Sequence, residues 1–105
     1  MMRIIFWRQN VPPPPNTPPT AGRDAFNEFV AALRKVPGAG EVHWGFGHGG
    51  IVMVGFPTSY AAADAILKDP GVQAAGMKVL ALGMGVAEDF FVTTPEQIMP
   101  FLPQQ

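Results

Sequence analysis

Two histidines lie close together in a glycine-rich stretch, and they are the residues of this sequence best suited to acid–base or metal chemistry. His43 stands in the segment EVHWGF, and His48 follows in GFGHGG. An imidazole titrates near neutral pH, so a histidine in an apolar cavity is suited to act as a general acid or base. The plainer alternative is a histidine satisfied by Glu41 or by backbone groups. We predict His43 as the catalytic residue of any enzymatic activity.

His48 is either a solvated loop residue or a group that touches a ligand. With His43 it makes only a pair of imidazoles, and no third ligand stands at a fixed spacing, whereas zinc sites use three or four protein ligands. The sequence has no cysteine, which excludes disulfides, a thiolate nucleophile and cysteine-bound metals. We therefore expect no metal and no other cofactor. The predicted ligand-binding residues are Trp7, Glu41, Met53 and His48.

The segment GFGHGG also matches the dinucleotide-binding pattern G-x-G-x-x-G. That pattern binds a pyrophosphate because its glycine turn leads from a strand into a helix, whose N-terminus meets the phosphates. Here the glycines lie between EVHWGF and IVMVGF, which are both typical of strands, so the helix is missing. Since glycine readily adopts the positive φ of tight turns, we interpret the stretch as the loop of a β-hairpin.

Strand alternation sets the direction in which His43 points. Val42, Trp44 and Phe46 share one face of their strand, while Glu41 and His43 share the other. Three bulky apolar side chains have the stronger claim to a helix-covered core, so we expect Glu41 and His43 on the open face of the sheet. The next strand, IVMVGF, is apolar on both faces, which is typical of a strand covered on both sides.

The other polar residues do not form an obvious catalytic group. Glu88 and Asp89 are adjacent on a predicted strand, so their side chains point to opposite faces. Ser59 is the only serine, and a helix-capping role explains it. Asp69 precedes Pro70, a pair typical of a helix start.

These residues need strands and helices to position them, and the apolar pattern predicts where those elements lie. We expect a first strand around residues 4–7, a helix over 21–36 capped by Thr20, and a last strand over 86–92. Residues 59–82 are predicted as two short helices or one kinked helix. The core stripe of the first helix consists of Phe26, Phe29, Val30 and Leu33.

Two segments stand apart from these elements. Residues 10–20 hold six prolines, which lack amide donors, so we predict a stiff connector over 11–20 without helix or strand. The alternative is a ligand for a proline-recognising domain. Thr94, Pro95 and Gln97 fit a helix-capping box, and the apolar residues after them predict that 94–105 docks on this domain or on a partner.

Composition limits the function classes. The chain has 105 residues, which suits a single domain spanning 1–105. With a net charge of -1 and no basic stripe, we expect no nucleic-acid partner. No apolar run reaches membrane-spanning length, and Arg8 interrupts the apolar start, so we expect no membrane association and a cytoplasmic location. A charged content of only 14% leaves apolar surface for a second copy of the chain to cover.

The predicted order is β-α-β-β-α-β, an α+β ferredoxin-like fold with a four-stranded antiparallel sheet and the helices on one face. This order, the hairpin HGGIVMVGF, and YAAADAILKDPGVQAAGMKV leading to EDFFV resemble the dimeric α/β-barrel superfamily. The similarity is greatest to small stress-responsive and antibiotic-biosynthesis monooxygenase-like proteins and to uncharacterised members. In that family two sheets close face to face into a barrel, so the resemblance implies a homodimer.

The resemblance leaves two functions open. The first is a cofactor-independent monooxygenase, isomerase or cyclase that acts on a small apolar molecule, with His43 as the acid or base. The second is a non-catalytic dimer that binds a small apolar ligand or stabilises a partner. The family favours an enzyme, whereas the shortage of polar groups on the strands favours a binding protein.

Overall fold

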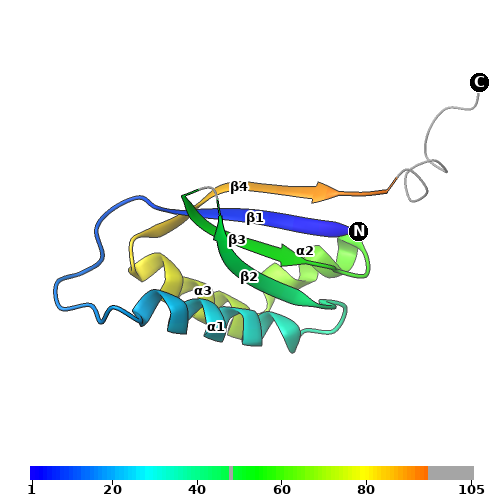
Figure 1. The fold of residues 1–105 in the computed structure, drawn as a ribbon. Coiled ribbons are helices and arrows are strands. Elements are labelled where there is room, and N and C mark those ends of the chain that lie inside the picture. Colours follow the sequence, from blue (N-terminus) through cyan, green and yellow to red (C-terminus); the bar gives the residue numbers. More distant parts are fainter. Residues whose placement is uncertain (48, 95–105) are drawn as a thin grey trace, which may run out of the picture.

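The computed structural model describes residues 1–47 and 49–94 of the chain. Its order of strands and helices confirms the predicted ferredoxin-like α+β fold, with the second helical region split in two (Figure 1). The elements are β1 (Met2–Gln9), α1 (Ala21–Arg34), β2 (Val42–Gly47), β3 (Gly50–Gly55), α2 (Tyr60–Lys68), α3 (Pro70–Ala81) and β4 (Met84–Val92).

The four strands form one antiparallel sheet in the order β2-β3-β1-β4. In Figure 1 the helices α1, α2 and α3 all lie on one side of this sheet. Met53 on β3 pairs with Ile5 on β1 and with Trp44 on β2, so these three side chains share the helix-covered face. The opposite face is uncovered by any described element. Val52 and Val54 on that face are half-buried in a single protomer, and the prediction that β3 is covered on both sides requires a second copy of the chain there.

Helix α1 forms where its apolar stripe was predicted, and all four stripe residues are buried. It ends at Arg34 rather than at residue 36. The turn that follows is tighter than an α-helical turn, because the amides of Lys35 and Val36 donate to carbonyls three residues back. Gly38 then turns the chain away at a positive φ of 85°.

The helix caps agree with the prediction at two of three positions. The Ser59 hydroxyl accepts a hydrogen bond from the Ala62 amide at 3.0 Å, and the Asp69 carboxylate accepts one from the Val72 amide at 3.0 Å. Thr20 occupies the N-cap position of α1 without a side-chain bond to the helix. Its backbone is helical rather than extended, so its hydroxyl is not aimed at the first-turn amides.

Strand β4 begins two residues earlier than predicted and contains an irregularity. Its pairing with β1 shifts between Phe6 and Trp7, where Glu88 and Val86 are the successive partners. One extra residue of β4 is thus left in the ladder as a bulge. Beyond the bulge, Glu88 and Asp89 point to opposite faces, as predicted.

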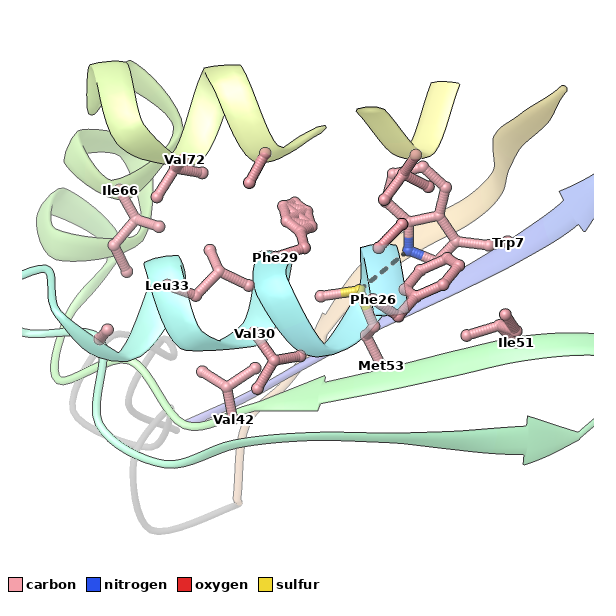
Figure 2. Packing of buried hydrophobic residues seen from close by; sticks show 14 residues of the cluster. Trp7, Phe26, Phe29, Val30, Leu33, Val42, Ile51, Met53, Ile66 and Val72 are labelled. Carbon is pink, nitrogen blue, oxygen red and sulfur yellow. Dashed lines mark hydrogen bonds between the residues drawn. The ribbon is translucent and has the colours of Figure 1, made fainter. Parts of the chain in front are cut away.

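The core lies between the sheet and the helices. Trp7 donates its indole N–H to the sulfur of Met53 at 3.1 Å and packs edge-on against Phe26 and Phe29, with ring centroids 5.5 and 5.9 Å away. Figure 2 shows this contact as a dashed line, with Phe26 beside the indole. Phe26 is completely buried at the centre of the core.

The proline-rich segment forms neither helix nor strand and loops out beyond α1 (Figure 1). Its start is fixed to the turn before β4, because the amides of Asn10 and Val11 both donate to the Gly83 carbonyl. His48, and the predicted docking tail apart from Thr94, lie outside the described residues.

Candidate functional site

A small cavity of about 60 Å³ lies between the sheet and the helices α1 and α2. Its wall is almost entirely apolar. The space exists partly because Gly55 has no side chain. Gly55 is the third inward position of β3, and the other two, Ile51 and Met53, carry large side chains. The lining residues are Arg3, Ile5, Phe29, Leu33, Ala39, Val42, Met53, Gly55, Pro57, Ala63, Ile66 and Leu67.

Several layers of the fold supply this wall. The sheet contributes Ile5 and Met53. Helix α1 contributes Phe29 and Leu33, and helix α2 contributes Ile66. Figure 2 shows Leu33 and Ile66 facing each other across the space between their helices. Most of these side chains belong to the buried core, so the cavity is part of the packed interior of the fold.

Arg3 is the one charged residue among the described residues that line the cavity. It shares the inward face of β1 with Ile5 and Trp7, and its side chain is only 15% exposed. A bidentate pair with Asp89 holds it: Nε donates to Oδ1 at 2.9 Å and Nη2 to Oδ2 at 2.6 Å. The guanidinium carbon also lies 5.1 Å from the ring centre of Phe91, a cation–π contact.

The environment of Arg3 keeps it charged. The hydrogen bond with Asp89 raises the pKa of Arg3 above its usual value, burial opposes this, and the charges of Asp89 and Asp64 add to the increase. The guanidinium therefore stays positive across neutral and alkaline pH. The Arg3 guanidinium has five N–H donors. Two of them donate to Asp89, and the other three make no hydrogen bond to the described part of the protein.

The predicted site residues fall into two separate places. Glu41 and His43 lie together on the open side of the sheet, where His43 Nε2 is 3.5 Å from Glu41 Oε2. Both side chains are well exposed, at 80% and 61%. Trp7 and Met53 lie together on the helix-covered side, and Met53 lines the cavity. The sheet separates the two pairs, so no single site contains all four, and their roles remain predictions.

Sequence reasoning missed Arg3 and Asp89 as members of a site. The available signal was parity: Arg3 shares the alternation of Ile5 and Trp7, so it had to point toward the helices. A charged group facing the core requires a partner, because an unpaired buried charge is costly. The identity of that partner depends on the pairing of β1 with β4, which local sequence does not specify.

Two other kinds of site find no support in the described residues. No group of three or more histidine, aspartate or glutamate side chains among them is arranged to hold a metal ion. None of the described helices has the length and apolar character needed to cross a membrane.

Comparison with known proteins identifies the fold. No family model and no curated protein sequence matches the chain. Solved structures do match. SnoaB, a cofactor-independent oxygenase from Streptomyces nogalater, superposes with a TM-score of 0.67 at 14% identity, over 89% of this chain and 93% of SnoaB. A dimeric ferredoxin-like protein of unknown function from Jannaschia gives 0.59 at 21% identity, over 88% of this chain and 100% of that protein.

An antibiotic biosynthesis monooxygenase-like protein from Chloroflexus aurantiacus gives a TM-score of 0.61 at 17% identity, over 85% of this chain and 87% of that protein. At these identities the similarity establishes the fold. The chain therefore has the same ferredoxin-like fold as these proteins, as its sequence resemblance predicted.

Proposed function

We propose that this protein is a homodimer that binds a small, mainly apolar molecule in the cavity between its sheet and its helices. The observation that carries the proposal is the apolar cavity itself, which Arg3 helps to line. A concave, mainly apolar space with a few placed polar groups is the usual composition of a small-molecule site.

The size of the cavity limits what it encloses. Typical ligand pockets measure about 300–1,000 Å³, so a space of about 60 Å³ takes the apolar end of a molecule. Leu67 is 45% exposed and Arg3 is partly exposed, and both also line the cavity. Solvent reaches the cavity beside these two residues, and the remainder of the ligand projects outward there.

The open face of the sheet supports the homodimer. Its central strands β1 and β3 carry only apolar side chains along most of their length, while His43 and Glu88 stand on the edge strands. An apolar centre with polar residues at its rim is typical of protein interfaces. Similar solved structures are described as dimeric. The apolar residues of this face are Met2, Ile4, Phe6, Val52, Val54, Phe90 and Val92.

Cofactor-independent oxygenation is the catalytic form of this proposal. It is favoured by the fold shared with SnoaB, which is described as such an oxygenase. In such a reaction the substrate itself supplies the electrons: a CH₂ group becomes C=O, one oxygen atom of O₂ enters the product, and the other leaves as water. An apolar cavity suits both reactants, since O₂ and an apolar substrate leave water readily. Binding without catalysis is the alternative, and consumption of O₂ on adding substrate separates the two.

A second location for the ligand is the space between two sheets. On this face β2 carries His43 and then two glycines, Gly45 and Gly47, so part of the strand is bare backbone. A molecule held there would touch His43, which is the predicted acid or base. A molecule in the inner cavity would not, because the sheet lies between them.

One pair of glycine variants tests the proposed location. Gly55→Val places a side chain in the inner cavity, where a new Cβ meets nothing closer than 3.8 Å. Gly45→Val is the matched control on the open face, where a new Cβ meets nothing within 4 Å. We expect ligand-observed NMR to show butyl methyl ketone binding to the wild type and to Gly45→Val, with binding lost in Gly55→Val. Loss in Gly45→Val alone would instead place the ligand between the sheets.

A further inference from the structure

Arg3 lines the cavity, and its guanidinium is a positioned hydrogen-bond donor whose charge is already balanced. Its two bonds to Asp89 and its contact with Phe91 fix its orientation. A donor fixed before binding loses little conformational entropy when a ligand arrives. The three N–H groups that Asp89 does not use are the only strong donors that a cavity-lining side chain offers among the described residues.

The charges around Arg3 cancel. Asp89 pairs with it directly, and Asp64 on α2 is near enough to raise its pKa. Lys68 in turn lies 3.2 Å from Asp64, measured from Nζ to Oδ2. Two positive and two negative side chains therefore form a linked group around Arg3, and this group has no net positive charge to attract an anion.

We propose that Arg3 determines the specificity of the cavity, selecting neutral apolar molecules that carry one hydrogen-bond acceptor oxygen, such as a ketone or an ester. This inference rests on the proposed function and names its ligand class. A pure hydrocarbon covers the Arg3 donors without replacing their bonds to water, which is unfavourable. A carboxylate loses its hydration beside the Asp89 carboxylate, and like charges repel. A neutral carbonyl avoids both costs.

Three probes of nearly equal shape test this ligand class. They are butyl methyl ketone, the alkene in which CH₂ replaces its carbonyl oxygen, and hexanoate. For the wild-type protein, NMR titration should give dissociation constants in the order ketone, then alkene and hexanoate. One hydrogen bond to a charged group corresponds to a preference of about tenfold or more for the ketone over the alkene.

Variants of Arg3 and Asp89 test whether Arg3 causes the preference for the ketone over the alkene. In Arg3→Met we expect the ketone and the alkene to bind with equal affinity, whereas Arg8→Met, at an exposed position of β1, should keep the wild-type order. Arg3→Met leaves Asp89 without its partner and is therefore at risk of unfolding. Asp89→Asn is the second variant: it keeps the shape of the carboxylate and removes its charge. Hexanoate should then gain affinity relative to the ketone.

The outcomes separate this inference from the function on which it rests. Equal binding of ketone and alkene to the wild type would overturn the role of Arg3 and leave the apolar site intact. Hexanoate binding more tightly than the ketone would also overturn it. If none of the three probes binds the wild type, the proposed function fails and this inference fails with it. An unchanged relative affinity for hexanoate in Asp89→Asn would contradict the charge balance.

Discussion

Trp7 and Met53 join β1 to β3 through a hydrogen bond from an indole nitrogen to a thioether sulfur, deep in the core. Sulfur is a weak acceptor, yet it is the partner that this buried N–H has. The pair fixes the rotamer of a side chain that contacts two phenylalanines of α1.

Met53→Leu tests the value of this contact at nearly constant volume. The substitution leaves the indole N–H of Trp7 unsatisfied, which costs about 1–3 kcal/mol. Urea denaturation should show a fall of that size in the free energy of unfolding. Met77→Leu on α3 is the control, because Met77 is 64% exposed. Equal effects of the two substitutions would show that the sulfur contact contributes nothing.

His43 gives a second prediction at the scale of single residues. If the ligand occupies the inner cavity, His43→Ala leaves the dissociation constant of butyl methyl ketone unchanged, because the sheet separates the two. The measurement is an NMR titration of wild type and variant, with circular dichroism to confirm the fold. A large loss of affinity would contradict this and would indicate that the ligand binds between two sheets, in contact with His43.

The residues that define the cavity were harder to predict than the residues that fill the core. Alternation correctly placed Val42 inward and His43 outward from the sequence alone. The partner of Arg3 was not predictable, because Asp89 is 86 positions away and its register depends on the bulge in β4. The cavity depends on what Gly55 leaves unfilled, and such a gap is a property of three-dimensional packing.

At the scale of elements, the three helix N-termini differ in how they are capped. Ser59 and Asp69 each accept a bond from a first-turn amide, whereas the side chain of Thr20 does not. Ser59→Ala and Asp69→Ala should each lower the free energy of unfolding by about 1 kcal/mol. Thr20→Ala should change it by less than about 0.5 kcal/mol. Thermal or urea unfolding of the three variants checks this, and an equal loss at Thr20 would contradict the assigned geometry.

The helices were predicted well because their signals are local. The stripe of α1, the capping residues and the Asp69–Pro70 interruption all lie within a few positions of the structure that they specify. Thr20 shows the limit of such signals, since a suitable residue type at the right position has the wrong backbone conformation. The bulge within β4 arises from strand pairing and has no local signal.

At the scale of the whole molecule, the uncovered sheet face predicts a homodimer. Sedimentation equilibrium at micromolar concentration should give twice the mass of the chain. Val54→Lys places a charge in the middle of this face, opposite Ile4 and His43, and should produce a monomer. Met77→Lys on the exposed surface of α3 is the control and should remain a dimer. A monomeric wild-type protein would contradict the assembly while leaving the inner cavity in place.

The central claim is that a small apolar molecule binds between the sheet and the helices, and neighbouring isoleucines on β1 test it directly. Ile5 lines the inner cavity together with Ile66, whereas Ile4 points to the open face. With methyl-labelled protein and butyl methyl ketone, intermolecular nuclear Overhauser effects should connect the ligand to the methyl groups of Ile5 and Ile66. Effects to Ile4 and Val54 with none to Ile5 or Ile66 would contradict the claim and place the ligand on the opposite side of the sheet.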